Sequence, residues 1–226
     1  MTPQTWPCPL PAGGLAREYA IAFDRRRKHR LLIVPALFDE ANKMRRLTLE
    51  VMRRLDASGI DSFLPDFPGC NESEQPLHAQ ATEDWLDAMS AAMAHFGATD
   101  ILGIRAGCLF TPKDLPTWHY APVKGETILR QMLRARILAS REAGIEEDRQ
   151  QLVDLALAQG IELAGYQLSA DFFEGFQRLV PAQSEDIHPV EQSMIGGSGL
   201  WLRAEPDENR EQADALAAVL SIGTTF

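Results

Sequence analysis

One five-residue segment has the spacing of a catalytic turn but carries an unexpected central residue. The segment Gly103–Gly107 (GIRAG) begins at the end of the apolar stretch at residues 99–104 and continues beyond it. Glycines at this spacing form the G-x-S-x-G turn, in which a sharp bend between a strand and a helix exposes the central side chain as a nucleophile. The central residue here is Arg105, whose guanidinium stays protonated and cannot attack a carbonyl carbon. The spacing therefore predicts the bend, whereas the residue type argues against acyl transfer at it.

Two further loops carry charged side chains that can meet Arg105. The segment 35–46 (PALFDEANKMRR) contains Asp39, Glu40, Asn42 and Lys43, and the segment 66–73 (DFPGCNES) contains Asp66 and Glu72. Because a buried cation is costly unless it is paired, we expect Arg105 to form a bidentate ion pair, with Glu40 or Asp39 as the first choice. In the alternative, Arg105, Lys43 and the helix N-terminus near Asn42 bind a carboxylate or a phosphate.

No complete acyl-transfer triad can be assembled from the sequence. In chains with a G-x-S-x-G turn, the nucleophile is followed by an acidic residue and then by a histidine near the C-terminus. The late acidic residues Glu205 and Asp207 are not followed by a histidine, since the five histidines are His29, His78, His95, His119 and His188. Serine-type catalysis therefore lacks both its nucleophile and its base, and we assign no catalytic residue.

Two cysteines are the remaining candidate nucleophiles. Cys108 follows the bend, where we expect a buried and inert thiol. Cys70 lies in the loop 66–73 near the mouth of the site, and a small turn residue is the simpler interpretation. An active ester or thioester hydrolase or acyltransferase that uses a non-serine nucleophile is the alternative to a noncatalytic protein. We also expect Trp118 to line a pocket at this site, beneath a helical cap.

The first half of the chain alternates short apolar strands with amphipathic helices. This order predicts a mostly parallel sheet with right-handed crossovers, whose ligands bind beyond the carboxyl ends of the strands. Residues 1–15 show no periodic pattern, and the basic run 25–30 (RRRKHR) suggests the solvated tip of a hairpin. We predict strands at residues 18–24, 31–34, 60–65 and 99–104, and helices at residues 42–58 and 83–96.

The second half is more helical, and we expect a helical cap over residues 112–180 within a single domain that spans residues 1–226. The predicted helix at 126–143 carries four arginines beside an apolar stripe, so it is either a fixed cap or a mobile lid or docking surface. The other predicted elements are a helix at 146–159, a strand or hairpin at 161–168, a helix at 170–179, a loop at 181–199, a strand at 200–204 and a helix at 209–220.

The composition excludes several classes of protein. The chain has 226 residues, of which 45% are hydrophobic and 24% charged, as in an ordinary globular domain. Its net charge of −10 argues against nucleic-acid binding, and three scattered cysteines are too few for a disulfide framework or a zinc site. No segment approaches the ~20 apolar residues of a membrane span. Since the first 15 residues lack a signal-peptide pattern, we expect a cytoplasmic protein. We also expect neither a metal nor a cofactor.

Five segments carry a resemblance to known proteins: 35–46, 65–73 (PDFPGCNES), 104–109 (IRAGCL), 118–139 and 200–206 (LWLRAEP). Together they resemble the α/β-hydrolase superfamily. They resemble more closely the hydrolase-like proteins that accompany the exosortase A (PEP-CTERM) sorting and exopolysaccharide systems of Gram-negative bacteria. The resemblance implies an α/β-hydrolase fold, with a mostly parallel sheet of six to eight strands, helices on both faces and a helical cap.

The resemblance and the residues together lead to one expected function. We expect a catalytically inactive hydrolase-like protein that serves as a binding or scaffolding component of an exopolysaccharide or protein-sorting system. Its partner would be an unidentified protein or a small anionic or acyl ligand. A third hypothesis is a regulatory protein that binds an anionic metabolite through Arg105.

Overall fold

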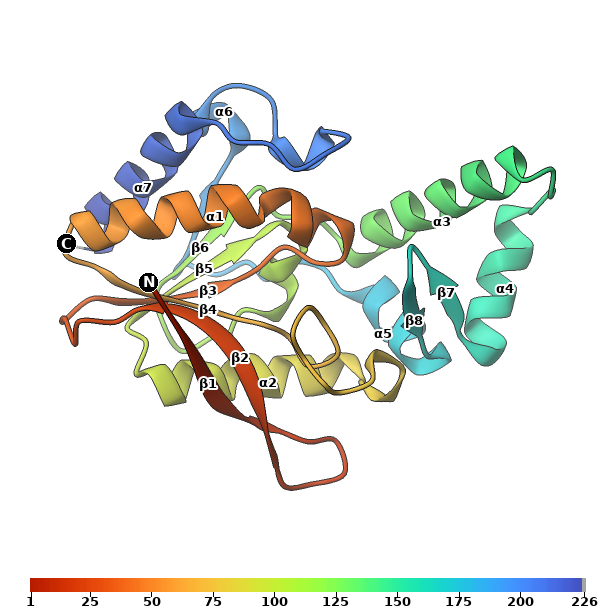
Figure 1. Cartoon of the computed structure of the whole chain (residues 1–226), viewed down its shortest axis with the longest axis horizontal. Coiled ribbons are helices and arrows are strands. Elements are labelled where there is room, and N and C mark those ends of the chain that lie inside the picture. The colour runs from red at the N-terminus through yellow and green to blue at the C-terminus, as the bar shows by residue number, and fades with distance from the viewer. Residues whose placement is uncertain (225–226) are drawn as a thin grey trace.

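A central seven-stranded sheet forms the body of the protein in the computed structural model, which describes residues 1–224 (Figure 1). Its strands are β1 (Thr2–Pro9), β2 (Leu15–Phe23), β3 (Arg30–Val34), β4 (Asp61–Pro65), β5 (Asp100–Ile104), β6 (Thr117–Tyr120) and β9 (Ile187–Val190). Their order across the sheet is β1-β2-β4-β3-β5-β6-β9. Strands β1, β2 and β4 pair antiparallel, and all pairs from β4 to β9 are parallel. The predicted fold class is confirmed.

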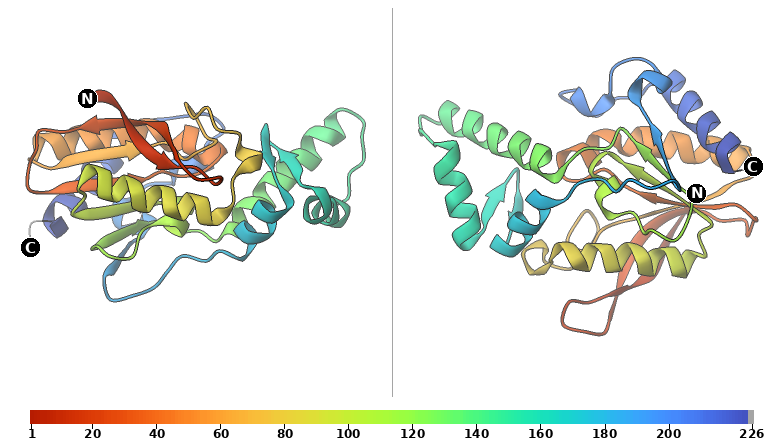
Figure 2. Two further views of the ribbon diagram at one scale, coloured as in Figure 1. Left: turned by 90° about the horizontal axis from the view of Figure 1, so that it is seen from below. Right: turned by 180° about the vertical axis from the view of Figure 1, so that it is seen from behind.

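Helices cover both faces of this sheet. Helices α1 (Asp39–Ala57) and α7 (Arg210–Thr224) pack on one face, and α2 (Thr82–Phe96) packs on the other (Figures 1 and 2). The central strand β3 is therefore buried on both sides, which explains its uninterrupted apolar sequence. Leu31 and Ile33 pack toward α1, whereas Leu32 and Val34 pack toward α2, as the alternation of side chains along a strand requires.

A helical subdomain projects beyond the carboxyl ends of the strands (Figures 1 and 2). It consists of α3 (Gly125–Glu142), α4 (Arg149–Gln159), the hairpin β7 (Ile161–Leu163) and β8 (Tyr166–Leu168), and α5 (Ala170–Arg178). We call residues 125–178 the cap. The range 112–180 predicted for a cap includes strand β6, which belongs to the sheet, so the projecting part begins only at Gly125.

Aromatic rings join the cap to the body. The ring of Phe38, just before α1, lies with its centroid 5.1 Å from that of Tyr166 and 5.6 Å from that of Phe176, both in edge-to-face geometry. Gly125 allows the chain to pass close to α5, because a Cβ atom there would lie 1.9 Å from the carbonyl oxygen of Phe176. The cap is thus packed against the carboxyl edge of the sheet and shares its core.

The N-terminal strand was missed by the sequence analysis. Residues 1–15 contain β1, which forms the antiparallel hairpin with β2. Trp6 anchors it: the ring is buried and its Nε1 donates to the carbonyl oxygen of Tyr19 at 3.3 Å. The hairpin predicted between the strands at 18–24 and 31–34 is wrong, because β4 lies between β2 and β3 in the sheet.

The basic run 25–30 is a turn that is solvated in part: Arg25, Arg26 and Lys28 are exposed, whereas other groups of the turn bind a buried carboxylate. Asp61 is fully buried at the start of β4 and accepts hydrogen bonds from the backbone N–H groups of Arg25 and Arg27. The guanidinium groups of Arg27 and Arg30 also contact its carboxylate, at 3.2 and 3.1 Å. This network fixes the connection between β2 and β3, at the end of the sheet opposite the cap.

The strand predicted at 200–204 is wrong. That segment forms a short 3₁₀ helix, η3 (Leu200–Leu202), whereas strand β9 and helix α6 (Gln192–Ile195) lie in the predicted loop at 181–199. Two further 3₁₀ helices are η1 (Leu77–Ala79) and η2 (Arg105–Phe110).

Over residues 1–224, no helix combines the length and the apolar character needed to cross a bilayer.

Candidate functional site

The predicted bend is present directly after strand β5. Arg105 has a φ of 55°, a left-handed conformation that costs a non-glycine residue about 1–3 kcal/mol. The flanking glycines permit close packing: a Cβ atom at Gly107 would lie 2.3 Å from the carbonyl oxygen of Pro35, and one at Gly103 would lie 2.9 Å from Cα of Cys108. The bend therefore holds Arg105 at the carboxyl edge of the sheet, between β3 and β6.

The guanidinium of Arg105 forms the predicted bidentate ion pair with Glu40. Its Nε donates to Oε2 at 3.0 Å and its Nη2 donates to Oε1 at 2.9 Å. Glu40 lies in the first turn of α1, and both residues are buried, at 7% and 6% exposure. A buried pair with this geometry uses both carboxylate oxygens, so the carboxylate of Glu40 neutralises the positive charge of Arg105.

Two further groups enclose the guanidinium. Its Nη1 donates to the carbonyl oxygen of Ala121, after β6, at 2.9 Å. Its carbon atom lies 4.1 Å from the ring centroid of Trp201 in η3, a cation–π contact. Arg105 thus joins α1, the end of β6 and η3. Trp201 is a site residue that no sequence pattern indicated, although it lies in the segment 200–206, which carries part of the family resemblance.

The other charged residues of the first loop are also paired. Asp39 Oδ2 lies 2.6 Å from Lys43 Nζ, one turn further along α1. Asn42 is exposed on the same helix. Both cations of the alternative anion site, Arg105 and Lys43, therefore already have carboxylate partners, which weakens that hypothesis.

Asp66 and Cys70 lie at the end of β4 and do not contact Arg105. Asp66 Oδ1 accepts a hydrogen bond from Asn71 Nδ2 at 2.9 Å, and burial raises the pKa of the carboxyl above its usual value. Burial, together with the charges of Asp66 and Glu18, raises the pKa of Cys70 to about 12. Since the thiolate is the nucleophilic form, this shift disfavours Cys70 as a nucleophile near neutral pH.

Cys108 and Trp118 are core residues. Burial raises the pKa of the Cys108 thiol far above its usual range, as the sequence analysis expected of an inert cysteine. Trp118 packs between the sheet and α7, with its ring centroid 5.6 Å from that of His188. The predicted place of Trp118 in a pocket beneath the cap is therefore wrong, because on β6 its side chain points to the face opposite α2.

His119 is buried on the other face of β6. Its Nε2 lies 2.9 Å from Oγ1 of Thr111, and burial lowers its pKa to about 4. Thr111 Oγ1 also donates to the carbonyl oxygen of Cys108 at 3.3 Å. The ring is therefore neutral near pH 7 and belongs to a hydrogen-bonded core group.

A cavity of about 260 Å³ lies beside the ion pair, between the first turn of α1 and helix α3. We call it the α1–α3 cavity. Glu40 forms part of its wall, and Arg105 lies behind Glu40. The lining residues are Leu37, Phe38, Asp39, Glu40, Ile128, Gln131, Met132, Ala135 and Ala164.

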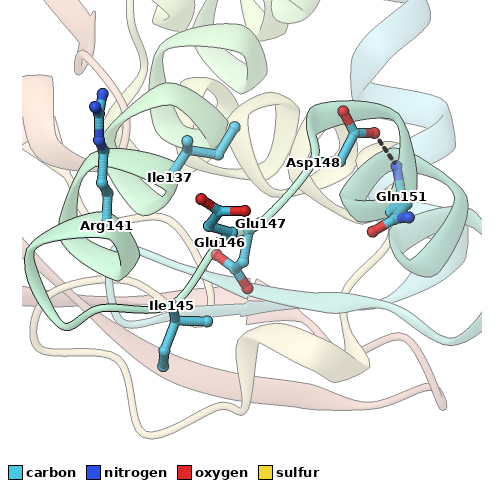
Figure 3. Close-up of a pocket in the computed structure, with 7 residues that line it drawn as sticks. All are labelled: Ile137, Arg141, Ile145, Glu146, Glu147, Asp148 and Gln151. Atoms are coloured by element: carbon cyan, nitrogen blue, oxygen red, sulfur yellow. Dashed lines mark hydrogen bonds between the residues drawn. The ribbon is translucent and has the colours of Figure 1, made fainter.

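A second cleft, of about 450 Å³, lies where α3 turns into α4 (Figure 3). Two of its three acidic side chains, Glu147 and Asp148, are already engaged. Glu147 binds Arg136 and accepts a hydrogen bond from Ser140, and Asp148 accepts from the backbone N–H of Gln151. The cleft is formed by cap residues only, away from the bend, so the α1–α3 cavity is the better candidate for a ligand.

Over residues 1–224, no group of three or more histidine, cysteine or acidic side chains is placed to hold a metal ion.

Comparison with solved structures establishes the class of fold. No family model and no curated protein matches the sequence. The mouse alpha/beta hydrolase domain-containing protein 10 is similar over 100% of this chain and 99% of its own, with a TM-score of 0.60 and 9% identity. The esterase domain of a Rhodothermus marinus protein is similar over 99% of this chain and 98% of its own, with a TM-score of 0.57 and 13% identity. The chain therefore has the α/β-hydrolase fold.

A third similar structure has another activity. The Bottromycin epimerase BotH, in complex with Bottromycin A2, is similar over 98% of this chain and 98% of its own, with a TM-score of 0.50 and 13% identity. At such low identities these likenesses concern the fold alone.

Proposed function

We propose that this chain is a noncatalytic protein of the α/β-hydrolase fold that acts by binding. The observation that carries the proposal is the buried Arg105–Glu40 ion pair at the bend after β5. The position at which this fold exposes a nucleophile is occupied by a permanently charged group. That group donates to Glu40, to the carbonyl oxygen of Ala121 and to no reacting atom.

The absence of a usable base supports the same conclusion. The last histidine along the chain, His188, lies within strand β9, so the sequence offers no imidazole after the last strand of the sheet. The pKa values of Cys70 and Cys108 are both raised, chiefly by burial, so neither thiol is activated. The alternative of a hydrolase or acyltransferase with a non-serine nucleophile therefore lacks an activated group.

The finer role that we propose is a binding or scaffolding component of an exopolysaccharide or protein-sorting system. Its support is the sequence resemblance of segments such as 35–46 and 65–73 to the exosortase-associated hydrolase-like proteins. The similar structure of BotH is described as an epimerase, in complex with Bottromycin A2, and not as a hydrolase. This fold thus hosts other functions than hydrolysis.

Catalytic inactivity is tested by assaying the purified protein against p-nitrophenyl esters of increasing chain length and against acyl thioesters. We expect no turnover above that of an equal amount of heat-denatured protein. Saturable turnover that is lost in Cys70→Ala or Cys108→Ala would overturn the proposal in favour of the alternative.

The missing base is tested with the Arg105→Ser variant. We expect it to remain inactive, because a restored hydroxyl still has no imidazole to accept its proton. The matched control is Arg105→Lys, which keeps the positive charge. Esterase activity in the serine variant, absent from the lysine variant, would show that another residue serves as the base.

A further inference from the structure

We infer that the α1–α3 cavity binds small, uncharged and mainly apolar molecules in preference to ions. The inference rests on the proposed binding function and names its class of ligand. Three observations carry it: the apolar walls, the pairing of the nearby charges and the volume.

The inner walls of the cavity are apolar and fixed. Leu37, Phe38, Ile128 and Met132 are each at most 5% exposed and belong to the core shared by body and cap. The aromatic contacts of Phe38 with Tyr166 and Phe176 hold the wall in place. An apolar group that enters from water gains about 25 cal/mol for each Å² of apolar surface that it buries.

The charged groups at the cavity cancel in pairs. Both carboxylate oxygens of Glu40 accept hydrogen bonds from Arg105, and Asp39 pairs with Lys43. An entering carboxylate would meet these two acidic side chains and no unpaired cation among the residues that line the cavity. An entering ammonium would have to compete with a bidentate guanidinium for Glu40. An uncharged group avoids both penalties, and the Gln131 amide on α3 offers it a donor and an acceptor.

The volume sets the size of the ligand. At about 260 Å³, the cavity is slightly smaller than the pockets of roughly 300–1,000 Å³ that hold drug-sized molecules. A short alkyl chain with a single polar group fits this space.

The test compares three six-carbon probes, 1-hexanol, hexanoate and hexylamine, by ligand-observed NMR titration of the full chain at pH 7. We expect 1-hexanol to bind about tenfold more tightly than either ion, a difference of about 1.4 kcal/mol. Equal or tighter binding of either ion would overturn the inference.

Two variants locate the site. Ala135→Leu fills the cavity and should abolish 1-hexanol binding, whereas Ala139→Leu, one turn further along α3 and outside the lining, should leave it unchanged. Asp39→Asn removes an exposed carboxylate and leaves Lys43 unpaired, so it should shift the preference toward hexanoate. Unchanged binding in Ala135→Leu would overturn the inference. Ester turnover would overturn the proposed noncatalytic function but not this ligand class, so the two failures are distinguishable.

Discussion

Arg105 has a backbone conformation that a long side chain rarely adopts, so its contacts must offset the strain. The guanidinium makes three charge-assisted hydrogen bonds and one cation–π contact with groups from three other parts of the chain. These contacts explain how the sharp bend of a hydrolase fold is kept although its central residue cannot attack a substrate. The same contacts make the bend a packing contact between the body strands, α1 and η3.

The Arg105–Glu40 pair predicts a strong difference between single and double substitutions. Glu40→Leu alone leaves a buried guanidinium without its carboxylate and should lower the free energy of unfolding by about 3–5 kcal/mol. The double variant Glu40→Leu/Arg105→Met removes both charges and should recover most of that loss. Urea denaturation followed by circular dichroism measures both. Additive losses in the double variant would mean that the two side chains do not act as a buried pair.

Asp66 predicts a dependence of stability on pH. Burial raises the pKa of its carboxyl, and its buried Oδ2 has no hydrogen-bond partner among residues 1–224. Because the folded state favours the protonated form, the contribution of Asp66 is favourable below its ordinary pKa and is lost as the pH rises through the raised value. Asp66→Asn, which cannot ionise, should therefore melt at a higher temperature than wild type at pH 7 and close to it at pH 3. The exposed substitution Asp39→Asn is the control, and a stability loss at pH 7 in Asp66→Asn would contradict this account.

The candidate site was predictable where local spacing or pairwise chemistry defined it. The spacing of Gly103 and Gly107 defined the bend, and the cost of a buried cation predicted Glu40 or Asp39 as its partner, of which the structure shows Glu40. Trp201 lies 96 positions beyond Arg105 in the chain, so no local pattern indicates their contact. Trp118 was misplaced because strand β6 was not recognised, and the face of a side chain depends on its position in the strand.

At the level of elements, the sequence revealed those strands that carry their own signal. Strands β3, β4 and β5 are buried on both faces and alternate with helices, and each contains consecutive apolar residues that indicate a strand. Strands β6 (TWHY) and β9 (IHPV) have four residues each and include polar residues or proline, so their structure depends on pairing with neighbours distant in sequence. Tertiary pairing and not local propensity determines such strands.

The junction of α3 and α5 predicts a specific requirement for glycine. A methyl group at residue 125 would clash with the carbonyl oxygen of Phe176, so Gly125→Ala should force the cap away from the body and cost about 1–3 kcal/mol. Chemical denaturation measures the loss, and limited proteolysis should show earlier cleavage within residues 125–178. The control is Lys124→Ala at the neighbouring exposed position. Equal stability and protease resistance in the two variants would mean that the cap is not fixed at this contact.

Over the whole molecule, the sheet separates two hydrophobic cores. One lies between the sheet, α1 and α7 and contains Leu216 and Trp118. The other lies between the sheet and α2 and continues into the cap, where Leu133, Leu163 and Phe172 belong to the same cluster as Trp85 of α2. The cap therefore has no separate core, and the two cores share the strands of one sheet.

This shared core predicts that cap and body unfold in one cooperative transition, as the single domain expected from the sequence would. Hydrogen exchange read by mass spectrometry at increasing urea distinguishes the regions. Amides of α5 in the cap and of the central strand β5 should lose protection at the same urea concentration, because Phe172 and Phe176 pack in the core that also contains Ile101. The tip of the cap at residues 143–148 is the internal control, since most of its side chains are exposed and its amides should exchange early. If α5 loses protection well before β5, the cap unfolds by itself, and the aromatic contacts of Phe38 do not couple it to the sheet.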